Sequence, residues 1–120
     1  MKLASELTRL FVYGSLKRGL ENHHVFAQAQ FVGECRTVSL YRLFDLGAYL
    51  ALSPGGESPV LGELYLVSEA VLRQLDAFEG VEYFRGSVTL SNGDPADAYL
   101  LADSARSRAR ELGADRWPTP

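Results

Sequence analysis

The alternation of apolar and polar residues predicts several short β-strands. From Val60 to Val67 both alternating sets of side chains are largely apolar, as expected for a strand that is covered on both faces. Asn92-Gly93 separates two further apolar runs, and this dipeptide is typical of a tight hairpin turn. The predicted strands are Arg9–Tyr13, Val60–Val67, Phe84–Leu90 and Ala96–Leu101, with two strands or one long bent strand within Phe31–Leu46.

One segment, from Ser68 to about Glu79, has the periodicity of an amphipathic helix. Ser68 is a suitable N-terminal cap, and Gly80 supplies the C-terminal stop. The apolar stripe consists of Val71, Leu72, Leu75 and Phe78. The polar side carries Glu69, Arg73 and Asp76.

Glu79 lies four residues after Leu75 and therefore extends the apolar stripe of this helix. A carboxylate on the core side is costly unless it is paired or protonated. Burial and the negative end of the helix both favour the neutral acid, so we expect a raised pKa that suits a general base. The pattern leaves open that Glu79 turns outward past the helix end or pairs with Arg85.

The remaining segments predict turns, loops and a second helix. Polar residues make Ser15–Asn22 a loop, and a proline with two glycines makes Ser53–Ser58 a turn. Ala48–Leu52 is a short apolar run. The other expectations are a helical turn at His24–Gln28, a last helix at Ser104–Leu112, and a tail at Gly113–Pro120 with Trp117 as its anchor.

These elements predict a single α+β domain over residues 1–120: a small mixed, mostly antiparallel, barrel-like sheet with one main helix packed on it. A chain of 120 residues that is 47% hydrophobic can form one modest core. With 12 basic and 15 acidic residues the net charge is −3, so no nucleic-acid or membrane partner is expected. The arginines at 106, 108 and 110 are flanked by acids and predict a solvated face.

Cysteine and histidine give little sign of metal chemistry. Cys35 is the single cysteine, which excludes an internal disulfide, and we expect it to be half-buried on a strand. His23 and His24 are adjacent and have no acidic cluster beside them, so we expect no metal site. The N-terminal stretch has no long apolar run, which predicts a cytoplasmic protein without a signal or membrane span.

The loop after the first predicted strand is a candidate anion site. Gly14 lets the backbone turn and approach a ligand closely. Successive N–H groups in such a turn can bind a carboxylate. The same short motif also fits an ordinary turn at the end of a strand, and it lacks the lysine and hydroxyl spacing of a phosphate-binding loop.

Four segments, in this order, resemble the γ-glutamylcyclotransferase-like superfamily, and its short γ-glutamylamine cyclotransferase and AIG2-like branch in particular. They are LFVYGSLKRGLENHH (Leu10 to His24), LGELYLV (Leu61 to Val67), LDAFEG (Leu75 to Gly80) and YFR (Tyr83 to Arg85). Together they span about two thirds of the chain. Ser15 stands where many short members have threonine. Leu16 stands where the larger glutathione-degrading branches have asparagine.

The resemblance implies an enzyme that releases 5-oxoproline and a free amine or amino acid from a γ-glutamyl compound, without a cofactor. It implies that Glu79 is the catalytic acid–base residue. It also implies that the amides of Gly14, Ser15 and Leu16 hold the substrate carboxylate. Tyr13, Tyr83 and Arg85 are further substrate-binding candidates. Leu16 and the short chain favour γ-glutamylamines over glutathione, and a monomer or homodimer is expected.

Two other classes of function fit the sequence. The same cradle in a non-catalytic module would bind a carboxylate-bearing metabolite or a peptide end. An interaction domain would use exposed aromatic residues, for which Tyr49, Phe84 and Trp117 are the candidates. A glutamate on the core side of the helix favours the enzyme, because binding alone needs no buried base.

Overall fold

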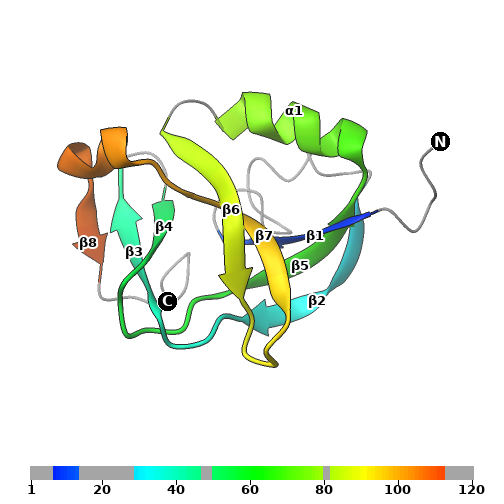
Figure 1. Cartoon of the computed structure of the whole chain (residues 1–120), viewed down its shortest axis with the longest axis horizontal. Helices are drawn as coiled ribbons and strands as arrows, with labels where there is room; N and C mark the ends of the chain where they lie inside the picture. Colours follow the sequence, from blue (N-terminus) through cyan, green and yellow to red (C-terminus); the bar gives the residue numbers. More distant parts are fainter. Residues whose placement is uncertain (1–6, 14–28, 47–49, 80–81, 113–120) are drawn as a thin grey trace.

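The computed structural model describes residues 7–13, 29–46, 50–79 and 82–112, and at 78–79, 108 and 111–112 it describes the backbone alone. The described chain forms an eight-stranded sheet, one α-helix and a short 3-10 helix (Figure 1). The strands are β1 Thr8–Val12, β2 Gln30–Arg36, β3 Tyr41–Asp45, β4 Leu50–Pro54, β5 Leu61–Val67, β6 Tyr83–Thr89, β7 Pro95–Leu101 and β8 Arg110–Leu112. The helices are α1 Glu69–Glu79 and the 3-10 helix η2 Asp103–Arg108.

The sheet is mixed and mostly antiparallel, as predicted. Its order is β2-β5-β1-β7-β4-β3-β8, and β6 pairs with β7. Among the described strands, both parallel pairings involve β7, which pairs with β1 through Leu10 and Asp97 and with β4 through Leu52 and Leu100. Because β6 pairs with β7 along its whole length, β1 and β4 share the other edge of β7.

The sheet is strongly curved but is not a closed barrel. Among the described strands, β2 and β8 lie at the two ends of the order and do not pair with each other. An isolated antiparallel bridge between Thr37 and Leu90 joins the chain just after β2 to the chain just after β6. The predicted α+β class is therefore confirmed, while the term barrel-like fits only loosely.

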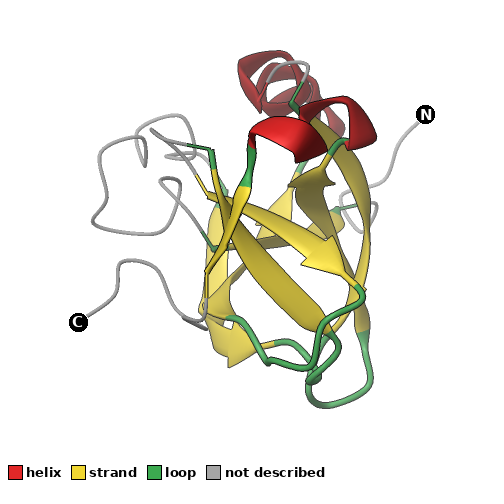
Figure 2. Ribbon diagram, turned by 90° about the vertical axis from the view of Figure 1, so that its left-hand side faces the viewer, coloured by secondary structure: helices red, strands yellow, loops and turns green. Residues whose placement is uncertain are grey.

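Helix α1 covers one face of this curved sheet (Figure 2). The Ser68 hydroxyl accepts a hydrogen bond from the Val71 N–H at 3.3 Å, so the predicted cap is present. Val71, Leu72 and Leu75 are buried in one cluster with side chains of the central strands. The strand residues of this cluster are Leu10, Val12, Tyr65, Val67 and Tyr99.

A second cluster fills the opposite, inner face of the sheet. Phe11 and Tyr13 alternate with the helix-facing Leu10 and Val12, so their side chains point the other way. The aliphatic members of this cluster include Leu43, Leu52, Val60, Leu64, Val88 and Leu100. The central strands β1, β5 and β7 are thus covered on both faces, as the sequence predicted for β5.

The structure decides between the alternatives for one predicted segment and shortens another. The Phe31–Leu46 region forms two separate strands, and the short apolar run after it becomes strand β4. Strand β4 extends to Pro54, so only the latter part of the predicted Ser53–Ser58 turn is a turn. There Gly55 has a φ of +97°, a conformation that favours glycine.

The prediction of a helix over Ser104–Leu112 was wrong in kind and length. Asp103–Arg108 is a 3-10 helix, and Arg110–Leu112 is strand β8, which pairs with β3. Ala105 is buried, whereas Arg106 and Arg110 are exposed, as predicted for this arginine-rich run. The Arg110 guanidinium on β8 pairs with Asp45 on β3 at 2.9 Å, so this ion pair links the edge strand to its neighbour. The predicted helical turn at His24–Gln28 and the Trp117 tail lie outside the described residues.

Candidate active site

The end of β1 is fixed by the side chain of Tyr13, which directly follows the strand. This side chain is 5% exposed, and its ring stacks against Phe11. The hydroxyl donates a hydrogen bond to the carbonyl oxygen of Tyr99 and accepts one from the Leu52 N–H at 2.9 Å. The Tyr13 hydroxyl is therefore bonded to the backbone of β7 and β4. The predicted cradle residues Gly14, Ser15 and Leu16 lie outside the described residues.

The second half of α1 is attached to the sheet by Asp76. The Arg85 guanidinium on β6 donates to both carboxylate oxygens, from Nε to Oδ1 at 3.0 Å and from Nη2 to Oδ2 at 3.4 Å. The Tyr99 hydroxyl on β7 donates to Oδ1 of the same carboxylate at 2.6 Å. Asp76 is thus not a purely solvated residue of the polar side, because two neighbouring strands bind it.

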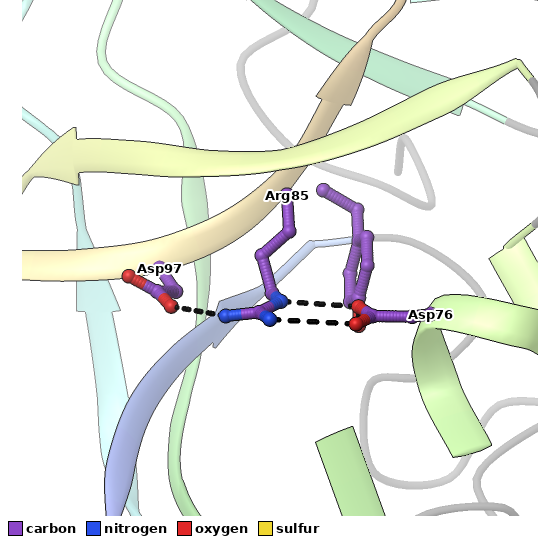
Figure 3. A network of polar contacts seen from close by, with 4 residues as sticks. Asp76, Arg85 and Asp97 are labelled. Carbon is purple, nitrogen blue, oxygen red and sulfur yellow. Dashed lines mark hydrogen bonds and ion pairs between the residues drawn. The ribbon is translucent and has the colours of Figure 1, made fainter. Parts of the chain in front are cut away.

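Arg85 lies between two carboxylates (Figure 3). Its third nitrogen, Nη1, donates to Oδ2 of Asp97 on β7 at 2.9 Å. Asp97 and Tyr99 are two residues apart on one strand, so their side chains lie on the same face. All three nitrogens of the guanidinium are therefore bonded to carboxylates in this structure.

The network shifts the pKa values of Asp76 and Arg85 in the directions that keep these two groups charged. Desolvation acts to raise the pKa of Asp76, but the hydrogen bonds from Arg85 and Tyr99 and the positive charge of Arg85 outweigh it, and the pKa is lowered. The hydrogen bonds to Asp76 and Asp97 raise the pKa of Arg85 against the opposing effect of desolvation. Asp76 and Arg85 are therefore both ionised at neutral pH.

Glu79 is the last residue of α1, as predicted from the pattern. It lies three residues after Asp76, which is about one helical turn along the axis of α1. The anchored Asp76 therefore fixes the helix about one turn before its end at Glu79. The side chain of Glu79 is outside the described part of the chain.

Tyr83 begins the strand that follows the helix. Its hydroxyl donates to the Leu50 carbonyl oxygen at 2.6 Å, and its ring packs against both the helix-side cluster and the cluster around Phe44. Arg85 lies two residues further along the same strand and so on the same face. Tyr83 and Arg85, both predicted site residues, therefore lie near the start of β6, the strand that follows α1.

The sequence interpretation did not single out Glu63, which the structure buries. Its side chain is on the central strand β5, and the residue is 5% exposed. It pairs in register with Val12 at the end of β1, and it accepts a hydrogen bond from the Tyr65 hydroxyl at 2.9 Å. The sequence signal for Glu63 is an acidic residue between apolar residues within a predicted strand. In the structure the Glu63 carboxyl group is buried beside β1, the strand that leads into the predicted cradle.

The sequence interpretation also missed Asp76 and Tyr99 as members of the site. The sequence predicts Asp76 on the polar side of the helix and Tyr99 within the strand Ala96–Leu101, without a role for either. The position of Asp76, three residues before Glu79, was a usable signal. Its hydrogen-bond partners on β6 and β7 could not be inferred from the sequence.

The described residues contain neither a cluster of metal ligands nor a helix that could span a membrane. Across residues 7–13, 29–46, 50–79 and 82–112, no group of three or more His, Cys, Asp or Glu side chains is arranged to hold a metal ion. None of the helices in these ranges is long and apolar enough to cross a membrane. Cys35 is a half-buried residue of β2, as predicted.

The described fold, a curved mixed sheet with one covering helix, is shared with a solved AIG2-like protein. The family model described as gamma-glutamyl cyclotransferase, AIG2-like, matches residues 10–119. The chain belongs to this family.

Relatives and solved structures agree with this assignment. A Vibrio cholerae serotype O1 protein, provisionally named gamma-glutamylcyclotransferase, is 46% identical over 99 residues, covering 81% of this chain and 84% of that protein. Gamma-glutamylaminecyclotransferase A of Danio rerio is 34% identical over 110 residues, covering 79% of this chain and 68% of its own. The crystal structure of an AIG2-like protein from Mus musculus superposes with a TM-score of 0.69 at 33% identity, covering 80% of this chain and 78% of that one.

Proposed function

We propose that this chain is a cyclotransferase that releases 5-oxoproline and a free amine or amino acid from a γ-glutamyl compound, with Glu79 as general acid and base. Membership of the γ-glutamyl cyclotransferase, AIG2-like family supports the reaction class. The observation that carries the assignment of Glu79 is its place as the last residue of α1, one turn beyond an aspartate bound to two strands.

The reaction is an intramolecular aminolysis in which every proton has a destination. The α-ammonium of the γ-glutamyl group gives a proton to the Glu79 carboxylate, because an ammonium has no lone pair. The amine nitrogen then attacks the γ-carbonyl carbon and closes a five-membered lactam. The bond from that carbon to the leaving nitrogen breaks as Glu79 returns its proton to that nitrogen. The ring nitrogen still carries a second proton to lose, and Glu79 takes it and passes it to the released amine, which departs as an ammonium.

Substrate orientation is assigned to the loop after β1. The amides of Gly14, Ser15 and Leu16 hold the α-carboxylate, which sets the amine against the γ-carbonyl. Orientation of this kind can supply roughly 7–11 kcal/mol of the barrier at best. Tyr13 supports this role because its buried hydroxyl is bonded to two strands just before the loop begins.

Tyr83 and Arg85 complete the proposed pocket on the side of β6. Tyr83 is held by the Leu50 carbonyl, and Arg85 lies on the same face of the strand with its guanidinium fixed by Asp76 and Asp97. Leu16, at the position where the glutathione-degrading branches have asparagine, favours a γ-glutamylamine as substrate. No metal or organic cofactor is required by this chemistry.

The test is 5-oxoproline release from a panel of γ-glutamylamines and γ-glutamyl amino acids, with wild type and Glu79→Gln compared. The substitution keeps the size of the side chain and removes the base, so we expect activity to fall by a factor of about 100 or more. Glu69→Gln is a matched control, because Glu69 lies at the other end of α1 in an exposed ion pair with Arg73.

Two outcomes would contradict the proposal. Equal activity of wild type and Glu79→Gln would remove Glu79 from the chemistry. A wild type that releases no product from any compound, but binds one of them by calorimetry, would support a non-catalytic metabolite-binding module instead.

A further inference from the structure

One residue, Tyr99, is hydrogen-bonded to both segments that lead into the proposed active site, the end of β1 and the second half of α1. Its backbone carbonyl accepts the hydrogen bond of Tyr13, which stands immediately before the cradle loop. Its side-chain hydroxyl donates to Asp76 at 2.6 Å, one helical turn before Glu79. The segment that leads into the cradle and the segment that leads into the base are therefore bonded to the same residue of β7.

Strand β7 is well suited to serve as this common support. It pairs with β6 on one edge and with β1 and β4 on the other. Ala98, Tyr99 and Leu100 are each at most 6% exposed. A strand that is paired on both edges and packed on both faces has little freedom to move, because densely packed interiors resist displacement.

Arg85 supplies a second attachment for the same carboxylate. It pairs in register with Tyr99 across the β6–β7 ladder, so the two donors that bind Asp76 come from directly opposite residues. Asp97 holds the guanidinium from the other side at 2.9 Å. The side-chain hydrogen bonds of Arg85 therefore go to α1, through Asp76, and to β7, through Asp97.

We propose that Tyr99 is a positioning residue that fixes the spacing between the cradle and Glu79, and that Arg85 and Asp76 act with it by anchoring the last turns of α1. This inference rests on the proposed function, and it assigns Arg85 a role that is exerted through the helix. The amine and the base must meet at hydrogen-bond distance, so an unanchored helix end would slow the chemical step more than it would weaken binding.

Three conservative substitutions, each close in shape to the original side chain, test this proposal. Tyr99→Phe removes the hydroxyl but leaves the carbonyl that binds Tyr13. Asp76→Asn removes the charge, and Arg85→Lys keeps the charge but loses the two-pronged geometry. We expect each to lower kcat by about 10- to 100-fold, with KM changed by less than about 3-fold, because a displacement of 1 Å can cost 100-fold.

A double-mutant design separates positioning from general damage. In the Glu79→Gln background, Tyr99→Phe and Asp76→Asn should change the residual rate by less than about 2-fold, because the residue through which they act is already gone. Val88→Ala, in the cluster on the other face of the sheet, is the control for a comparable loss of stability. Glu69→Gln is the control for a broken ion pair on the same helix.

The inference is overturned if Tyr99→Phe and Asp76→Asn keep wild-type kcat. It is also overturned if they lose the same factor with and without Glu79, or if Val88→Ala at equal stability loses as much activity. In each of these cases an active wild type with an inactive Glu79→Gln leaves the proposed function standing. A wild type that is inactive on the whole panel overturns both proposals.

Discussion

Removal of one oxygen atom, in Tyr13→Phe, should destabilise the fold out of proportion to its size. The Tyr13 hydroxyl serves two backbone groups at once, the Leu52 N–H and the Tyr99 carbonyl. Leu52 is 0% exposed and Tyr99 is 6% exposed, so water cannot readily replace the lost partner. Each buried polar group left without a partner costs about 1–3 kcal/mol, which places the total loss for the two groups at roughly 2–6 kcal/mol.

The assay is equilibrium unfolding in urea, with the free energy of unfolding obtained by linear extrapolation. Tyr41→Phe is the matched comparison, because the Tyr41 hydroxyl accepts from one backbone N–H, that of the exposed Thr89. Water can reach that site, so the cost there should stay below about 1 kcal/mol. A loss in Tyr13→Phe that is no larger than in Tyr41→Phe would refute the reasoning.

Two further predictions follow from local geometry and charge. A Cβ at Gly62 would lie 2.3 Å from the Val12 carbonyl oxygen, so Gly62→Ala should lower the free energy of unfolding by about 3 kcal/mol or more. A Cβ at Gly33 meets no atom within 4 Å, so Gly33→Ala should be tolerated. Equal urea midpoints for these two variants would contradict this. The pKa of Asp76 is lowered by its partners, so its contribution to stability should be complete above the pKa of an unfolded carboxyl, about 4, and be lost as the pH falls through the folded value. Asp76→Asn should therefore flatten the acid limb of stability against pH, by less than about 1 kcal/mol because the carboxylate is 42% exposed, and an unchanged slope would argue against it.

Local patterns were sufficient to predict the elements that pack on both faces or carry a clear cap. The strand at Leu61–Val67 followed from apolar residues at both alternating sets, and burial on a central strand requires just that. The helix followed from its period and from Ser68, and the β6–β7 hairpin from Asn92-Gly93, where Gly93 has a φ of +92°.

The segments that were misassigned, or left without an assignment, are those whose state depends on a distant partner. Strand β8 has only three residues, and it is a strand because β3 lies beside it. The same is true of β4, a short apolar run that pairs with β3 on one edge and touches β7 on the other. No local signal distinguishes such runs from helical turns or loops, because short apolar segments fit either period.

By itself the sequence determined the fold class, the helix and the nomination of Glu79, because period, caps and turns are local properties of the chain. The family motifs added the cradle at Gly14–Leu16, which lies outside the described residues. Only the tertiary structure decided which groups bind one another. Tyr13 and Tyr99 are separated by 86 positions and Tyr99 and Asp76 by 23, so the bonds that join them arise from the packing of β1, β7 and α1. Such hydrogen bonds depend on positions in space, and no periodicity in the sequence encodes them.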